Sequence, residues 1–165
     1  MMRLAALLLP VILLGGCQTL TGVPDLPGPE GAVDSEGFLC HDFDLLWETA
    51  KIQATRQGYR IDDDATTYRE RRIVTSWKTE LATTVNDGKR RRRYVDFVEV
   101  PGQKNTWKVR VAVVVQKNGS FEDPLNPTAA KWKEDFPDVE DAQRVAYMIE
   151  SQFREFGPSP EFQNR

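Results

Sequence analysis

The clearest secondary-structure signal in the chain is the segment Trp107-Lys108-Val109-Arg110-Val111-Ala112-Val113-Val114-Val115-Gln116. Successive side chains of a β-strand point to opposite faces, so Trp107 shares one face with every second residue after it. That face is wholly apolar, whereas the other face begins with Lys108 and Arg110. The segment therefore predicts a strand in a sheet that has one face on a hydrophobic core and the other at least partly in water.

Three further strands are predicted before this one, at residues 59–62, 72–78 and 92–100. These segments alternate in polarity or are rich in β-branched and aromatic residues, which favours strands. Turn-forming residues at 86–88 and 101–105 separate the later strands. Because the connections are short, we expect the four strands to form an antiparallel meander.

A helix is predicted on each side of the strands. The first begins at Asp42, a suitable N-cap, and ends near Gly58. The second follows Pro137 and ends before Gly157-Pro158, while residues 121–136 are read as a loop with one helical turn near 129–132. Apolar residues recur at helical spacing in both, at Phe43, Leu46, Trp47, Ala50 and Ala54, and at Val139, Ala142, Ala146, Ile149, Phe153 and Phe156. This order predicts an α+β, two-layer domain, a four-stranded antiparallel meander with both helices on one face.

The N-terminus has the features of a secretory signal. Residues 1–16 contain a basic start at Arg3, an apolar run of 11 residues, and two glycines before Cys17. The run is too short to span a bilayer, which takes about 20 residues. The sequence Leu13-Leu14-Gly15-Gly16-Cys17 resembles the lipobox of bacterial lipoproteins, the substrates of type II signal peptidase. This resemblance implies that residues 1–16 are removed and that Cys17 is lipidated.

The lipobox also implies a location in the cell envelope. Bacterial lipoproteins carry a diacylglyceryl group on the cysteine and usually a third chain on its nitrogen, enough lipid for stable anchoring. The residue after Cys17 is Gln18 rather than Asp, which by the sorting rule of this class favours the outer membrane, facing the periplasm, over retention in the inner membrane. Residues 17–37 are rich in Pro and Gly and predict a flexible linker. The globular domain is expected at 38–157, followed by a disordered tail at 158–165.

The charge of the chain and its cysteine content limit the partners and the disulfides that it is expected to have. The chain has 22 basic and 25 acidic residues, a net charge of −3, whereas nucleic-acid-binding domains are usually basic. Nucleic acid is therefore not an expected partner. With Cys17 lipidated, Cys40 is unpaired within the chain, so it is either buried or bonded to another molecule, and burial is favoured.

The most unusual internal feature is the basic run from Lys89 to Arg93. In a strand, Arg90 and Arg92 share a face with Tyr94, and Arg110 or Lys108 joins that face if the two long strands pair. The simpler interpretation is a charged strand that protects a sheet edge. The functional hypothesis is that Arg90, Arg91, Arg92, Arg93 and Arg110 form a patch that contacts anionic lipid, lipopolysaccharide phosphates or an acidic partner protein.

No motif indicates a reaction, a metal or a cofactor. His41 is the only histidine, and it lies beside Cys40, whereas a tight zinc site has three or four protein ligands. The run Asp62-Asp63-Asp64 lacks the alternating ligands of an EF-hand and is read as a solvated turn. We therefore predict no catalytic residue and no metal site.

The order of elements around Gly58-Tyr59-Arg60-Ile61-Asp62 and Ile73-Val74-Thr75-Ser76-Trp77, followed by two long strands and a helix, resembles a helix-grip domain. Small envelope lipoproteins use such domains, among them an accessory lipoprotein of the outer-membrane β-barrel assembly machinery. The resemblance covers residues 38–156 and transfers no functional residue. The first hypothesis is a non-catalytic interaction or assembly module. The alternatives are a lipoprotein that binds a small molecule or lipid between sheet and helices, and an enzyme that acts on envelope polymers.

Overall fold

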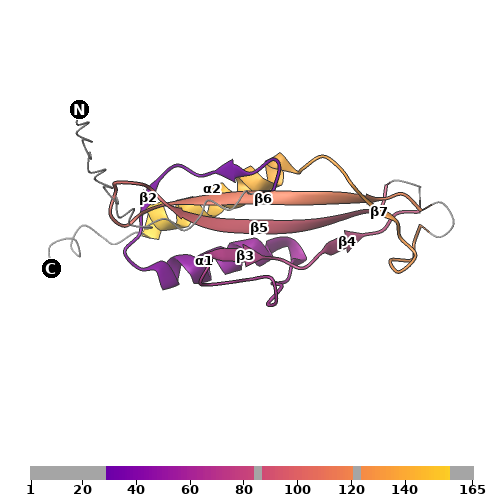
Figure 1. The fold of residues 1–165 in the computed structure, drawn as a ribbon, viewed down its shortest axis with the longest axis horizontal. Helices are drawn as coiled ribbons and strands as arrows, with labels where there is room; N and C mark the ends of the chain where they lie inside the picture. The colour runs from indigo at the N-terminus through magenta and orange to yellow at the C-terminus, as the bar shows by residue number, and fades with distance from the viewer. Residues whose placement is uncertain (1–28, 84–86, 121–123, 157–165) are drawn as a thin grey trace, which may run out of the picture.

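The computed structural model describes residues 29–83, 87–120 and 124–156. It shows an α+β fold, as predicted, in which a sheet packs against two helices (Figure 1). The helical elements are α1 (Phe43–Thr55), the short 3-10 helix η1 (Arg56–Gly58) and α2 (Val139–Phe156). The strands are β1 (Val33–Asp34), β2 (Phe38–Leu39), β3 (Arg72–Val74), β4 (Lys78–Glu80), β5 (Lys89–Glu99), β6 (Thr106–Asn118) and β7 (Trp132–Glu134). The predicted signal, Cys17, the first part of the predicted linker and the predicted tail lie outside the described residues.

The sheet is built on the long hairpin of β5 and β6. These strands pair in antiparallel register over 11 residue pairs, from Lys89 opposite Lys117 to Glu99 opposite Trp107. Shorter antiparallel strands extend the hairpin on both sides: β3 and β4 pair with β5, and β1, β2 and β7 pair with β6. The sheet is therefore four strands wide along much of the hairpin, although it contains more strands than the predicted four.

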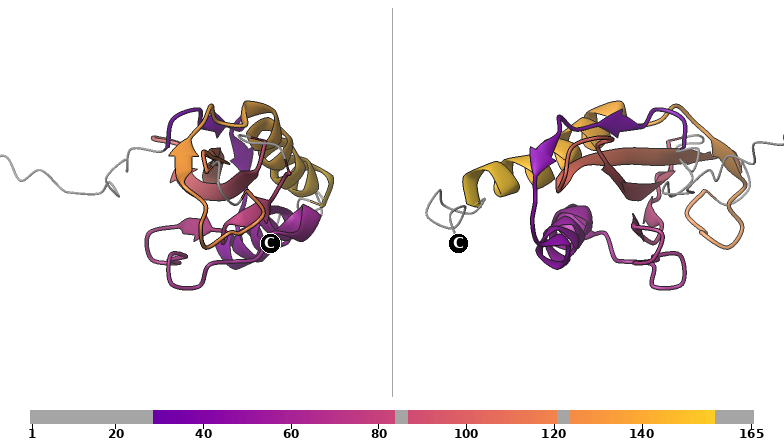
Figure 2. Two further views of the ribbon diagram at one scale, coloured as in Figure 1. Left: turned by 90° about the vertical axis from the view of Figure 1, so that its right-hand side faces the viewer. Right: turned by 60° about the vertical axis from the view of Figure 1, so that its left-hand side comes forward.

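Both helices cover the same face of this sheet (Figure 2). The face of β6 that was predicted to be apolar is buried, with Val109, Val111 and Val113 fully inaccessible to solvent. Helix α1 packs Leu46 and Ala50 into the same core, and α2 adds its own apolar stripe, including Ala142, Val145, Ala146, Ile149 and Phe153. The predicted two-layer arrangement is thus confirmed.

The helix boundaries follow from local chemistry. The Asp42 carboxylate accepts a hydrogen bond from the Leu45 amide, so Asp42 is the N-cap of α1, as predicted. Gly58 has a φ of +83°, a conformation that glycine adopts without strain, and the chain leaves the helix there. At the start of α2, the Asp138 carboxylate accepts from the Asp141 amide and supplies the equivalent cap.

Several predicted elements differ in the structure. Residues 59–62 form only an isolated bridge between Ile61 and Thr75 rather than a strand. The predicted strand 72–78 is divided into β3 and the start of β4. In the segment 121–136, the described part contains β7 and no helical turn, because residues 132–134 pair with the end of β6. In segments this short, the alternation of polar and apolar residues covers too few positions to show where strand pairing stops.

The N-terminal boundary of the fold also differs from the prediction. Residues 33–34 were assigned to the linker, yet they form β1 and pair with Val111 and Arg110. Ser35 continues this contact, since its amide donates to the Val109 carbonyl and its hydroxyl accepts from the Val109 amide. The edge of β6 attracts this segment because an unpaired strand edge leaves backbone groups without partners.

The two neighbouring leucines at the start of α1 test the assignment of its buried face. Leu46 is fully buried, whereas 55% of Leu45 is exposed. Leu46→Ala should lower the free energy of unfolding by about 2–5 kcal/mol because it leaves a cavity in the core. Leu45→Ala should change it by about 0.5 kcal/mol or less. Urea unfolding followed by tryptophan fluorescence measures both, and equal effects would contradict the assigned face.

Candidate functional site

The structure divides the basic run between the two faces of the sheet. Arg90 and Arg92 lie on the face away from the helices, together with Tyr94, because they alternate with the buried residues Arg93 and Val95. Arg110 lies on this same open face, opposite Asp96. The predicted sharing of one face by Arg90, Arg92, Tyr94 and Arg110 is therefore confirmed. Arg91 and Arg93 point to the helical side and do not belong to that surface.

Arg93 is part of the core, not of a surface patch. Its side chain is 1% exposed, and its guanidinium forms a bidentate ion pair with Asp141 of α2 at 2.8 Å for both bonds. Its other N–H groups donate to the carbonyls of Ala54 and Arg56 and to the side chain of Gln57. All five guanidinium donors thus have acceptors, so Arg93 joins β5, the end of α1 and the start of α2.

The surroundings of this ion pair keep Asp141 charged. Burial by itself would raise the pKa of the Asp141 carboxyl, but hydrogen bonds from Arg93 and Arg144 hold this pKa below its usual value. The Arg93 guanidinium also lies over the Tyr59 ring, 3.8 Å from its centroid. Burial raises the pKa of the Tyr59 hydroxyl, so this ring remains neutral beside the ion pair.

Three other arginines of the hypothesised patch each contact a carboxylate. Arg91 pairs with Glu80 and Asp138, Arg92 with Asp62, and Arg110 with Asp34. Arg110 also lies apart from Arg92, since Val114, which faces Arg92, is four residues or about 14 Å further along β6. The five arginines therefore do not form one continuous surface of uncompensated positive charge.

Arg90 has a different environment. Its guanidinium lies over two indole rings, 4.4 Å from the Trp77 centroid and 4.7 Å from the Trp132 centroid. Its Nε donates to the side chain of Gln116, 2.7 Å away. Within the described part of the chain, no carboxylate pairs with it and no acceptor binds its terminal nitrogens. We call Trp77, Arg90 and Trp132 the tryptophan–arginine stack.

Sequence reasoning missed the two tryptophans of this stack. Trp132 is far from Arg90 in sequence, and it reaches β6 only through β7, which was not predicted. Trp77 was placed inside a continuous strand, whereas it lies between β3 and β4. The available signal was the alternation in β5, which correctly placed Arg90 on the open face.

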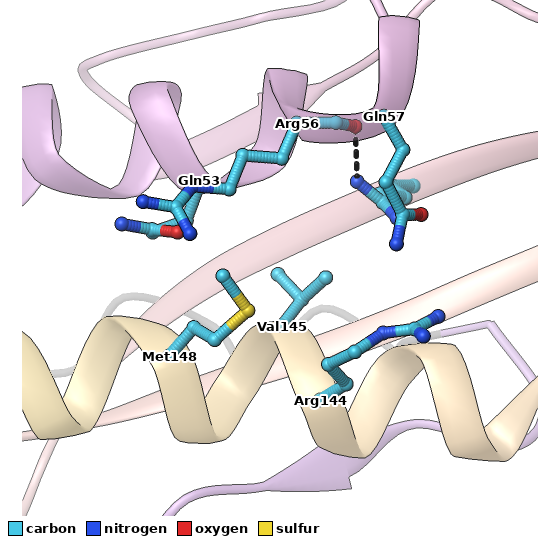
Figure 3. Close-up of a pocket in the computed structure, with 7 residues that line it drawn as sticks. Gln53, Arg56, Gln57, Arg144, Val145 and Met148 are labelled. Carbon is cyan, nitrogen blue, oxygen red and sulfur yellow. Dashed lines mark hydrogen bonds between the residues drawn. The ribbon is translucent and has the colours of Figure 1, made fainter.

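A second polar feature lies between the two helices. A cavity of about 320 Å³ is lined by Gln53, Arg56, Gln57, Arg93, Arg144, Val145 and Met148. Figure 3 shows Gln53, Arg56 and Gln57 extending from α1 and η1 toward the gap, and Arg144, Val145 and Met148 facing them from α2. No sequence pattern indicates this site, because only the helix packing brings these residues together.

Gln53 is the exceptional residue of this cavity. It is 1% exposed, and neither its Oε1 nor its Nε2 has a hydrogen-bond partner among the described residues. A buried amide without partners is costly, and such groups are rare in folded proteins. The surrounding side chains therefore leave one buried donor group and one buried acceptor without a protein partner beside the cavity.

The remaining sequence candidates have local structural roles. Cys40 is buried, as favoured, and its thiol donates to the carbonyl of Asp42, while burial raises the pKa of the thiol. His41 is exposed and contacts Asn105. Asp62 accepts from the amide of Ala65 and pairs with Arg92. No group of three or more His, Cys, Asp or Glu side chains converges within the described residues.

Scans of the sequence against protein-family models and curated proteins give no match. The resemblance to helix-grip lipoproteins therefore remains a prediction from the sequence. Within the part of the chain that the structure covers, no helix is long and apolar enough to cross a bilayer.

Arg93 and Arg91 provide a matched test of the buried ion pair. Arg93→Gln should lower the free energy of unfolding by about 3 kcal/mol or more, because Asp141 loses its buried partner. Arg91→Gln removes a partly exposed charge and should cost about 1 kcal/mol or less. Equilibrium urea unfolding compares the two variants. A small effect for Arg93→Gln would show that the network does not hold the layers together.

Proposed function

We propose that this chain is an outer-membrane lipoprotein, anchored through Cys17, whose folded domain is a non-catalytic module that binds an acidic segment of another envelope protein. The lipobox and the secretory signal support the anchor. The observation that carries the proposed interaction is the tryptophan–arginine stack on the open face of the sheet.

The stack has the composition and geometry of a protein-binding hot spot. Tryptophan and arginine are enriched among the residues that dominate binding energy at protein interfaces. The Arg90 guanidinium carbon lies 4.4 Å from the centroid of the Trp77 ring and 4.7 Å from that of Trp132, and its terminal nitrogens have no acceptor among the described residues. The hydrogen bond to the Gln116 side chain occupies only the Nε donor of Arg90. A carboxylate in the guanidinium plane could accept from the terminal nitrogens, the arrangement in which arginine binds acidic groups most strongly.

The position of the stack supports access by a partner. Trp132 belongs to β7, and Trp77 immediately precedes β4. Both strands lie toward the end of the β5–β6 hairpin that extends beyond the two helices (Figure 1). A partner could therefore approach the stack without contact with α1 or α2.

The distribution of charge favours a protein partner over a lipid surface. Membrane binding by basic residues typically uses a cluster of four to eight Lys or Arg side chains, each adding about 1 kcal/mol. Here Arg91, Arg92 and Arg110 contact carboxylates, and Arg93 is buried. One arginine oriented by two aromatic rings suits recognition of a particular acidic group better than general attraction to anionic headgroups.

An enzymatic role has less support from the observed surfaces. The hypothesis of an enzyme acting on envelope polymers called for carboxylates that converge in a cleft. The cavity between the helices is instead lined by arginine, glutamine and apolar side chains. These side chains are suited to binding rather than to hydrolysis, so we favour a non-catalytic interaction module over a hydrolase.

The proposed anchor is tested with two cysteine variants. Cys17→Ala should abolish incorporation of labelled fatty acid and remove the protein from the detergent-soluble membrane fraction, because no acyl acceptor remains. Cys40→Ala should retain full labelling, since that thiol is buried in the folded domain. Metabolic labelling of both variants in cells gives the answer. Persistent labelling of Cys17→Ala would refute the anchor.

The proposed interaction is tested by photo-crosslinking in intact envelopes. A photoreactive amino acid at Glu134 lies in the row formed by Glu134, Gln116 and Arg90 across the open face. We expect a protein adduct. After Arg90→Gln, about tenfold more partner should be needed for the same yield of adduct, because a hot-spot contact is lost. Arg91→Gln, which changes the next residue on the opposite face, should leave the adduct unchanged. Adducts with lipid alone, or equal yields from both variants, would contradict the proposal.

A further inference from the structure

The cavity between α1 and α2 has the properties of a small-molecule site that is separate from the open face. Its volume of about 320 Å³ lies within the range of known ligand pockets. It has apolar lining from Val145 and Met148 and polar lining from both helices. Figure 3 shows the Met148 side chain reaching from α2 toward Gln53 and Arg56.

Gln53 defines the hydrogen bonding that an occupant must supply. Its Oε1 needs a donor and its Nε2 needs an acceptor, and no described residue provides either. Helix packing leaves only 1% of Gln53 exposed, and Gln53 lines the cavity. A hydroxyl group can donate and accept, which makes hydroxyl groups suitable partners for both atoms.

The charge of the lining defines the second requirement. Arg56, Arg93 and Arg144 line the cavity, and Asp141 is the carboxylate that pairs with two of them. Arg93 has all its donors occupied and acts as a wall. Arg56 is exposed and forms no ion pair within the described residues, and the Arg144 side chain is 53% exposed. These two guanidinium groups leave the cavity attractive to an anion.

We propose that this cavity binds a small hydroxylated anion, such as a sugar phosphate or a sugar acid. Its hydroxyl groups pair with the amide of Gln53, its anionic group binds Arg56, and its C–H surface packs on Val145 and Met148, while Arg144 adds positive charge at the other end of the cavity. The proposal depends on the cavity alone, so it stands or falls separately from the binding of an acidic protein segment at the tryptophan–arginine stack.

Titration calorimetry on the mature protein in detergent tests the ligand class. The probes are glucose 6-phosphate, glucuronate, neutral glucose and inorganic phosphate. We expect glucose 6-phosphate or glucuronate to bind at least about tenfold more tightly than glucose or phosphate, because only they satisfy both requirements. Whichever of these two probes binds more tightly shows whether the site prefers a phosphate or a carboxylate group. If neither binds, or if phosphate alone binds as tightly, the proposal is overturned.

Variants of the lining establish where the probe binds. Gln53→Met conserves volume and removes both polar atoms, so it should weaken binding about tenfold or more while leaving the melting temperature equal or higher. Arg56→Gln, an exposed change, should weaken binding by a similar factor. Arg60→Gln, an exposed arginine outside the cavity, is the control. Unchanged binding in Arg56→Gln would overturn the proposal. This result decides the question even if the Gln53→Met variant does not fold.

Discussion

The antiparallel pairing of β5 with β6 is the constraint on which the rest of the structure depends. Its register assigns each side chain of both strands to one of two faces, because neighbours alternate. One face receives Val109, Val111 and Val113 of β6 with Val95 and Phe97 of β5, as well as Arg93, and both helices pack there. The other face receives Arg90, Arg92 and Arg110. A shift of one residue in β5 would exchange these sets and expose the core.

The ion pair of Arg93 and Asp141 is the polar counterpart of that core. It connects β5 to α2, while the remaining donors of Arg93 bind carbonyls at the end of α1. Replacement of one buried charge alone leaves the other without a partner, so the loss of either Arg93 or Asp141 is strongly destabilising. The same contacts form one wall of the cavity between the helices.

The two candidate surfaces use arginine in different ways. On the open face, the Arg90 guanidinium lies over the rings of Trp77 and Trp132, and its terminal nitrogens remain for an acidic group. In the cavity, Arg93 has all its donors occupied and forms one wall, and the more exposed Arg56 and Arg144 provide the charge. Each site combines residues from segments far apart in the chain. A protein with both sites could bind a macromolecular partner and a small anion at separate places.

Local patterns in the sequence determined the fold class, the helix faces and caps, and the face of each long strand. These features depend on period and on neighbouring residues, as with Asp42 and the valines of β6. Tertiary structure alone decided that Arg93 is buried, that Trp132 joins Arg90, and that Gln53 meets the cavity. A charged side chain enters a core only when a distant partner such as Asp141 compensates its desolvation, and no local pattern reveals that partner.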